Sequence, residues 1–103
     1  MKIYTVWRND GCNGFRVVAS YENEEDANIH LKSIKDCITN VKSKPNACIS
    51  KNDAKKIKFI DPTSVIEVGE NTYQLGSVED YFIGIREIYP SFRSFLNTRS
   101  SVE

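Results

Sequence analysis

The chain has 103 residues, of which 40% are hydrophobic and eleven are aromatic. This length fits one compact domain, and the aromatic content argues against wholesale disorder. The fourteen basic and fourteen acidic side chains cancel, so no overall field draws the protein to nucleic acid or to anionic lipid. At the N-terminus, Trp7 and Arg8 come before any apolar run long enough for a signal peptide or membrane span, which predicts a cytoplasmic protein.

Residues 2–8 and 15–21 are rich in β-branched and aromatic side chains, and turn-forming residues separate them, so we expect a β-hairpin. Cys12 lies in that turn between Gly11 and Gly14. No basic side chain adjoins Cys12 in the sequence to stabilise a thiolate, and no helix follows the glycines to bind an anion. The stretch therefore favours a structural turn over a reactive loop.

The first strand of this hairpin carries apolar side chains on both faces. Alternation puts Ile3 and Trp7 on one face and Tyr4 and Val6 on the other. Such a strand is central in its sheet, or one of its faces binds a partner.

The next segment, from Asn23 to Val41, predicts an amphipathic helix. Asn23 can cap its first amides, and the acidic residues 24–26 suit the positive end of the helix dipole. Helical spacing gathers the apolar side chains on one stripe that includes His30 and Cys37.

Residues 42–56 lack a sustained period and contain Pro45, so they predict a long loop. From 42 to 58 there are six lysines and one aspartate, a local charge of 6 − 1 = +5. This basic loop is a candidate contact for phosphates or for an acidic protein surface.

The second half predicts strands at 56–60, 64–68 and 72–75, then a helix that begins at Ser77 and runs to Tyr89, and a short helix at 91–97. The expected fold class is α+β, a two-layer sandwich with a mainly antiparallel sheet of four to five strands and two main helices on one face. Residues 1–97 would form one domain in ββα-ββα-like order, with residues 98–103 as a frayed tail.

Candidate catalytic and metal-binding patterns are weak. The sequence contains no P-loop, dinucleotide-binding or zinc-protease motif, and its carboxylates fall where helix starts and turns favour acids. Cys12, Cys37, Cys48 and His30 match the count for structural zinc but lack close paired spacings. We therefore expect no metal, no cofactor and no catalytic site, with an enzyme built on Cys12 or on scattered carboxylates as a minor alternative.

The segment NGFRVVASY resembles the strand motif of RNA-recognition modules, whose aromatics stack on bases. It departs from that motif at Asn13, where a basic residue is usual, and at Val18, where an aromatic is usual.

The leading hypothesis is a small non-catalytic protein-binding module, such as a stoichiometric inhibitor or adaptor of a host protein encoded by a phage or mobile element. A nucleic-acid-binding module that uses the basic loop is the second hypothesis, and a homo-oligomer is compatible with either. The open face of the hairpin would supply the anchor, and the lysines would steer an acidic partner. The candidate contact residues are Tyr4, Trp7, Arg8, Arg16, Lys42, Lys44, Lys51, Lys55, Lys56 and Lys58.

Overall fold

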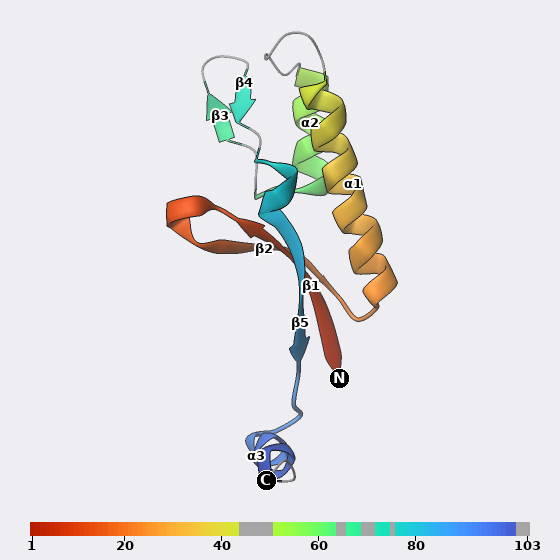
Figure 1. The fold of residues 1–103 in the computed structure, drawn as a ribbon, viewed down its shortest axis with the longest axis vertical. Helices are drawn as coiled ribbons and strands as arrows, with labels where there is room; N and C mark the ends of the chain where they lie inside the picture. Colours follow the sequence, from red (N-terminus) through yellow and green to blue (C-terminus); the bar gives the residue numbers. More distant parts are fainter. Residues whose placement is uncertain (44–50, 64–65, 69–71, 75, 101–103) are drawn as a thin grey trace.

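The computed structural model describes residues 1–43, 51–63, 66–68, 72–74 and 76–100. In chain order, its helices and strands are β1 (Lys2–Asn9), β2 (Phe15–Tyr21), α1 (Glu24–Lys42), α2 (Lys51–Ile60), β3 (Ile66–Val68), β4 (Thr72–Gln74), β5 (Tyr81–Glu87) and α3 (Phe92–Ser100). Two 3-10 turns complete them, η1 (Gly11–Asn13) and η2 (Val78–Asp80). The predicted α+β class is confirmed (Figure 1).

The main sheet has three antiparallel strands in the order β2-β1-β5, so β1 is central. The strands β3 and β4 pair only with each other among the described residues, as a separate two-stranded sheet. The predicted two-layer sandwich with a single sheet of four to five strands is therefore not confirmed by the described residues. These residues form one main sheet of three strands and a separate small hairpin.

The first hairpin forms as predicted, and its turn is built from glycines with positive φ. Gly11 has φ 60° and Gly14 has φ 84°, and the amide of Asp10 donates to the Gly14 carbonyl over 2.7 Å. Side chains other than glycine rarely adopt these φ values. The glycines of the turn are thus explained by backbone geometry.

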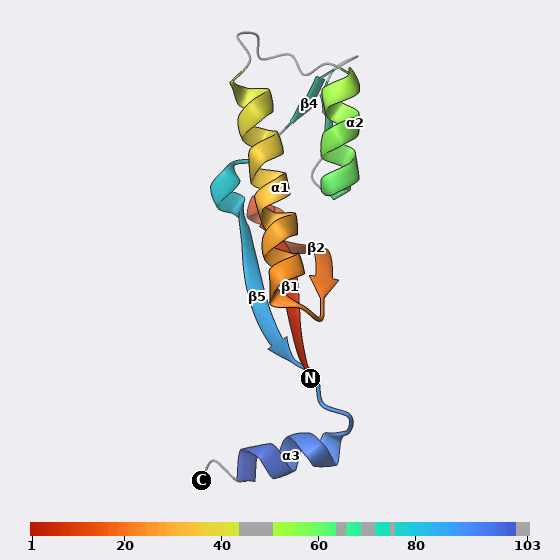
Figure 2. The ribbon, with the colours of Figure 1, turned by 90° about the vertical axis from the view of Figure 1, so that its right-hand side faces the viewer.

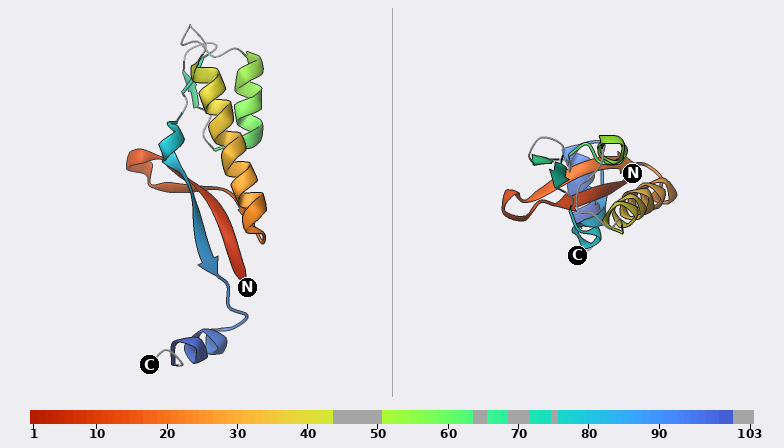
Figure 3. Two further views of the ribbon diagram at one scale, coloured as in Figure 1. Left: turned by 45° about the vertical axis from the view of Figure 1, so that its right-hand side comes forward. Right: turned by 90° about the horizontal axis from the view of Figure 1, so that it is seen from above.

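Helix α1 covers one face of the main sheet, and α2 lies beside α1 (Figures 2 and 3). The buried centre combines residues of α1 with residues of β1 and β5: Val6, Ala27, Ile34, Ile38 and Tyr81. These helix positions belong to the predicted apolar stripe, because side chains three and four residues apart share one helix face.

The start of α1 matches the sequence signal. The side chain of Asn23 accepts a hydrogen bond from the amide of Glu25 over 2.8 Å. Replacing Asn23 by alanine should lower the free energy of unfolding by about 1 kcal/mol, because one first-turn amide loses its partner. Urea denaturation followed by circular dichroism would measure this loss, and an unchanged midpoint would contradict the role of the cap.

Residues 51–60 form a helix, so the predicted loop up to residue 56 and strand at 56–60 are wrong there. Ala54 and Ile57 lie three residues apart and pack with Val41 of α1 in a second small core. Packing against α1 selects the helical period over the short alternating pattern of KIKFI. Residues 44–50, the rest of the predicted loop, lie outside the described residues.

The predicted helix from Ser77 to Tyr89 is also wrong. The capping box of Ser77 and Asp80 does form, but it caps only the single turn η2. The chain then continues as β5, which pairs with β1 from Arg8↔Tyr81 to Lys2↔Glu87. Pairing with a central strand overrides the helical spacing of the apolar residues in this segment.

Helix α3 confirms the predicted short C-terminal helix and extends it to Ser100, into the segment expected to fray. Residues 101–103 lie outside the described residues. The helix follows β5 and lies beyond the end of the sheet (Figures 1 and 2). The molecule is elongated as a result, with extents of 57 × 28 × 19 Å.

Candidate functional site

The face of the main sheet opposite α1 carries a cluster of exposed apolar side chains from all three strands. Phe15 is 62% exposed, Val17 is 47% exposed and Phe82 is 40% exposed, and half-buried Trp7 lies at register with Val17 and Phe82. We call Trp7, Phe15, Val17, Phe82 and Arg86 the aromatic face.

The side chains of the aromatic face are held by one another. The rings of Phe15 and Phe82 meet edge to face, with centroids 5.6 Å apart and planes at 88°. The guanidinium carbon of Arg86 lies 6.0 Å from the centre of the Trp7 ring, within reach of a cation–π interaction. Such contacts order a surface before any partner arrives, which lowers the entropy cost of binding.

Gly84 gives the Trp7 indole its place on the sheet. A Cβ atom at Gly84 would lie 2.7 Å from Nε1 and 3.0 Å from Cδ1 of Trp7. Since β1 pairs Thr5 with Gly84, the indole leans along β5 over the one position that has no side chain. The glycine thus leaves room for the Trp7 indole on the open face.

A register shift between β1 and β2 decides which β2 side chains join this face. Val6 pairs with Ala19 but the next residue, Trp7, pairs with Val17. The skipped residue, Val18, packs against the core beside α1. The bulge therefore places Val17 on the open face and Val18 in the interior.

Of the hairpin residues predicted as contacts, only Trp7 lies on the aromatic face. Tyr4 packs against the core on the α1 side of the sheet. Arg8 is 6% exposed on that same side, and its guanidinium donates to the Thr63 carbonyl over 2.8 Å. Arg16 is exposed but is paired with Arg8 in the register, away from Trp7. The structure therefore does not bring Arg8 and Arg16 beside Trp7, and the guanidinium that lies next to the indole is that of Arg86.

Asp10 holds both arginines of the hairpin. One of its oxygens lies 3.4 Å from Nη2 of Arg8 and the other lies 2.7 Å from Nε of Arg16. Within the part of the chain that the structure describes, Nε of buried Arg8 has no hydrogen-bond partner. These charges brace the hairpin against the segment at Thr63.

The predicted lysine contacts do not form one loop beside the aromatic face. Lys55, Lys56 and Lys58 are exposed on α2, which packs on α1 and so belongs to the opposite side of the sheet. Lys42 ends α1 and Lys51 begins α2, whereas Lys44 lies outside the described residues. The predicted steering of an acidic partner by these lysines stays a prediction.

His30 is fixed between two elements. Its Nε2 lies 2.6 Å from the carbonyl oxygen of Ile60, and its Nδ1 lies 2.7 Å from the hydroxyl of Tyr21. A carbonyl only accepts hydrogen bonds, so Nε2 carries a proton, and in the neutral ring Tyr21 donates to Nδ1. Both nitrogens are thus engaged in joining β2 and α1 to the end of α2.

A buried carboxylate, that of Asp61, directly follows Ile60, whose carbonyl oxygen contacts His30. Asp61 is fully buried, and it accepts hydrogen bonds from the Tyr81 hydroxyl over 2.5 Å and from the amide and hydroxyl of Thr63 over 3.0 and 2.7 Å. Neither Asp61 nor Tyr81 reaches solvent, since Tyr81 is 2% exposed. The geometry suits a structural tie between the α2 end and β5.

The four residues considered for zinc are not brought together where the structure describes them. Within residues 1–43, 51–63, 66–68, 72–74 and 76–100, no group of three or more histidine, cysteine, aspartate or glutamate side chains could hold a metal ion. Cys12 is exposed in η1, Cys37 lies on α1, and Cys48 lies outside the described residues.

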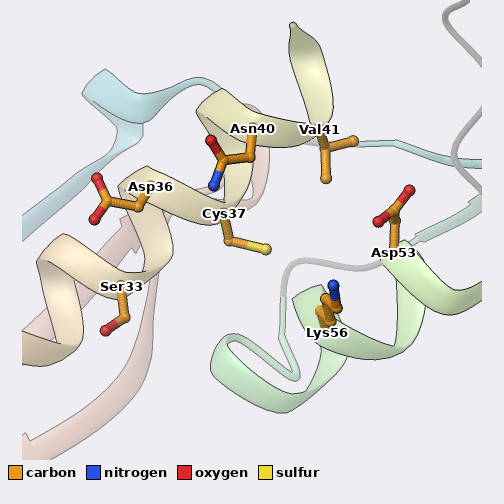
Figure 4. A pocket seen from close by; sticks show the side chains of 7 residues that line it. All are labelled: Ser33, Asp36, Cys37, Asn40, Val41, Asp53 and Lys56. Carbon is orange, nitrogen blue, oxygen red and sulfur yellow. The ribbon is translucent and has the colours of Figure 1, made fainter. Parts of the chain in front are cut away.

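A cavity of about 530 Å³ opens between α1 and α2 around Cys37 (Figure 4). The Cys37 sulfur points toward α2, from which Asp53 and Lys56 project. Burial raises the pKa of the Cys37 thiol, while Lys56 lowers it and Asp53 adds to the increase. The thiol is therefore protonated at neutral pH, and a protonated thiol is a poor nucleophile.

The two described cysteines should differ in reactivity as a consequence. At neutral pH, iodoacetamide should modify exposed Cys12 well before half-buried Cys37, because alkylation requires an accessible thiolate. Mass spectrometry of peptides from timed samples would measure the order. Faster labelling of Cys37 would contradict a cavity lined by a protonated thiol.

Trp7 is the only tryptophan, so its fluorescence reports on the aromatic face alone. Gly84→Ala should move the indole off β5 and shift its emission to longer wavelength, because the added methyl group occupies its present position. Gly76→Ala is the control, since Gly76 adjoins Tyr81 and Asp80 instead of Trp7. An unchanged spectrum in Gly84→Ala would contradict the contact.

Comparison of the chain with models of protein families, with curated proteins and with solved structures gave no match. In the described ranges, none of the helices has the length and apolar character needed to cross a membrane.

Proposed function

We propose that this protein is a non-catalytic protein-binding module and that the aromatic face is its main contact surface. The observation that carries the proposal is the gathering of Trp7, Phe15, Val17 and Phe82 on the face of the sheet opposite α1. Isolated exposed apolar residues are ordinary, but a contiguous patch drawn from three strands is typical of an interface.

The composition of the face fits the centre of a protein interface. Aromatic residues and arginine are enriched at such centres and supply most of their binding energy. Phe15 and Phe82 offer rigid apolar area, and Arg86 offers a charge at one side of the indole. The complementary partner surface is apolar at its centre with a carboxylate placed to meet Arg86.

The charge distribution favours a protein partner over nucleic acid at this face. Asp10 neutralises Arg16, and the amino terminus pairs with Glu87 at 3.0 Å. Arg86 is the cation that the described residues place over the aromatic face, and phosphate recognition needs several. An inhibitor or adaptor of another protein would need only the apolar side chains of the aromatic face and the charge of Arg86 beside them.

Affinity capture with matched variants tests the proposal. Phe15→Ser removes an exposed ring from the aromatic face, whereas Phe59→Ser removes a ring that is 88% exposed on α2. The parent and Phe59→Ser should both retain the same protein from lysate of the native host, and Phe15→Ser should lose it. Equal capture by all three, or loss with Phe59→Ser alone, would place the interface elsewhere.

Single-stranded nucleic acid is the second candidate, because aromatic side chains on an open sheet can stack on bases. Edge-to-face packing of Phe15 and Phe82 and the branched Val17 leave less flat ring surface for stacking. A gel-shift titration with single-stranded RNA and DNA at rising salt decides between the two. If the protein shifts these nucleic acids, and the shift weakens steeply as salt rises and requires Phe15, nucleic-acid binding would replace the protein-binding proposal.

A further inference from the structure

The polar groups that the aromatic face offers to a partner are hydrogen-bond donors. Trp7 contributes an indole N–H and Arg86 contributes a guanidinium, and the other three side chains are hydrocarbon. Neither an indole nor a guanidinium accepts hydrogen bonds. The guanidinium carbon lies 6.0 Å from the centre of the indole ring, so the two groups are neighbours. A carboxylate of the partner supplies acceptors for both groups and neutralises the charge.

The width of the aromatic face fits one helix. Its side chains come from three strands, which span about 10 Å at about 4.8 Å between neighbours. Along β5 the face runs from Phe82 to Arg86, about 13 Å at about 3.3 Å per residue. An α-helix has a diameter of about 10–12 Å, and about nine of its residues cover that length. A typical partner sheet of about four to six strands would extend well beyond these side chains.

The backbone of the bound segment also needs hydrogen-bond partners at this face. An extended segment has no internal hydrogen bonds, and its buried amides would need acceptors that the five side chains of the aromatic face do not contain. Burying an unpaired amide costs free energy. A helix pairs its own backbone groups, so it can bury apolar side chains against exposed Phe15 and Phe82 without this cost.

The described helices of this chain do not supply such a segment. Among large apolar side chains, α1 exposes Ile29 and α2 exposes Phe59, so neither helix presents an apolar stripe over its described residues. Helix α3 exposes Phe92 and Leu96 but contains no acidic residue. The aromatic face of a second copy would bring a second Arg86 instead of a carboxylate. The bound helix therefore belongs to another protein.

We propose that the aromatic face binds an amphipathic α-helix of another protein and that a carboxylate of this helix meets Arg86. The inference rests on the proposed function and names the kind of partner segment. Apolar residues of the helix, three and four positions apart, cover Phe15, Val17 and Phe82. The acidic residue lies at the edge of that apolar stripe, next to the indole and the guanidinium.

Three synthetic peptides without tryptophan test the inference on the full chain. Each has blocked ends and about fourteen residues, since shorter helices are marginal in water. The first carries leucines at helical spacing with a glutamate beside them, and the second has lysine in place of that glutamate. The third has the composition of the first, with its leucines scattered around the helix. Titration is followed by the emission of Trp7, the only tryptophan.

The first two peptides should give a saturable shift of this emission to shorter wavelength, because the bound helix removes water from the indole. The glutamate peptide should bind with about fivefold or higher affinity than the lysine peptide. The scattered peptide should give no saturable shift. Equal affinity of the glutamate and lysine peptides, a scattered peptide that binds like the first, or no saturable shift with any peptide would overturn the inference.

Two charge-reversal variants show where the glutamate of the peptide lies. Arg86→Glu should prefer the lysine peptide, because the sign of the charge beside the indole is reversed. Arg93→Glu is the matched control at an exposed arginine of α3, and it should keep the preference of the parent. An Arg86→Glu variant that still prefers the glutamate peptide would contradict the contact.

The inference and the proposed function fail separately. Capture of a host protein that requires Phe15 supports the proposed function even where no peptide binds, and in that case only the helix is excluded. Capture of the same protein by the parent and by Phe15→Ser removes the aromatic face from the interface, and the proposed helix contact then fails with it.

Discussion

Replacing Asp61 by alanine is expected to lower the free energy of unfolding by about 3 kcal/mol, because the change leaves one buried donor and two half-buried donors without an acceptor. The Tyr81 hydroxyl and the amide and hydroxyl of Thr63 all donate to Asp61. Tyr81 is 2% exposed, so water cannot replace the lost acceptor without opening the core. Urea denaturation followed by Trp7 emission measures the loss.

Two control variants distinguish the loss of the hydrogen bonds to Asp61 from a general effect of removing a charge. Asp36→Ala removes an exposed carboxylate on α1 and should change stability by less than about 0.5 kcal/mol. Thr63→Val removes one of the donors to Asp61 and should cost about 1 kcal/mol. A loss in Asp61→Ala no larger than in Asp36→Ala would show that the carboxylate does not tie α2 to β5.

Replacing Phe15 by alanine is expected to weaken binding of the captured partner by about 2 kcal/mol or more, which is about 30-fold in the dissociation constant. The ring is 62% exposed, so most of its area is buried only in the complex. The loss should lie mainly in faster dissociation, since removing an apolar contact hardly changes the rate of encounter. Surface plasmon resonance resolves the two rates.

Phe59→Ala is the matched control for this affinity, because Phe59 is an exposed phenylalanine on α2, away from the aromatic face. Its affinity should equal that of the parent. Arg86→Gln should fall between the two variants, since it removes the charge near the indole and keeps most of the side chain. A Phe15→Ala variant that binds like the parent would remove this face from the interface.

The first 42 residues were predictable because their signals are local. Turn residues separate two β-branched runs, and Asn23 begins a helix whose apolar stripe is complete within its own sequence. These signals lie within β1, β2 and α1 themselves, although β5 and α2 complete the burial of the stripe. The structure agrees with the sequence where neighbouring residues carry the information.

Helix α2 and strand β5 were mispredicted because distant contacts decide them. Ala54 and Ile57 gain their apolar environment only from Val41 of α1. The segment Tyr81–Glu87 gains its strand conformation from β1, more than seventy residues earlier in the chain. A single sequence shows neither partner, so local periodicity assigned both segments to the wrong class.

The candidate site was predicted in part for the same reason. Alternation showed that both faces of β1 are apolar, but only the packing of α1 decides that Tyr4 is covered and Trp7 is left on the open face. Phe82 and Arg86 were missed because β5 was taken for a helix. Phe82, Gly84 and Arg86 alternate along YFIGIRE, and such alternation is typical of one face of a strand, so this pattern could have predicted their place on the sheet.

The most direct test of the aromatic face as the protein contact uses Trp7, the only tryptophan of the chain, labelled with 5-fluorotryptophan. The fluorine spectrum of the parent should contain one resonance, which reports on the aromatic face whatever tryptophans the partner carries. Adding the captured partner should shift that resonance, because the indole becomes enclosed between Arg86 and the partner surface. An unchanged resonance in a sample whose complex is confirmed by gel filtration would contradict the assignment of the aromatic face as the contact surface.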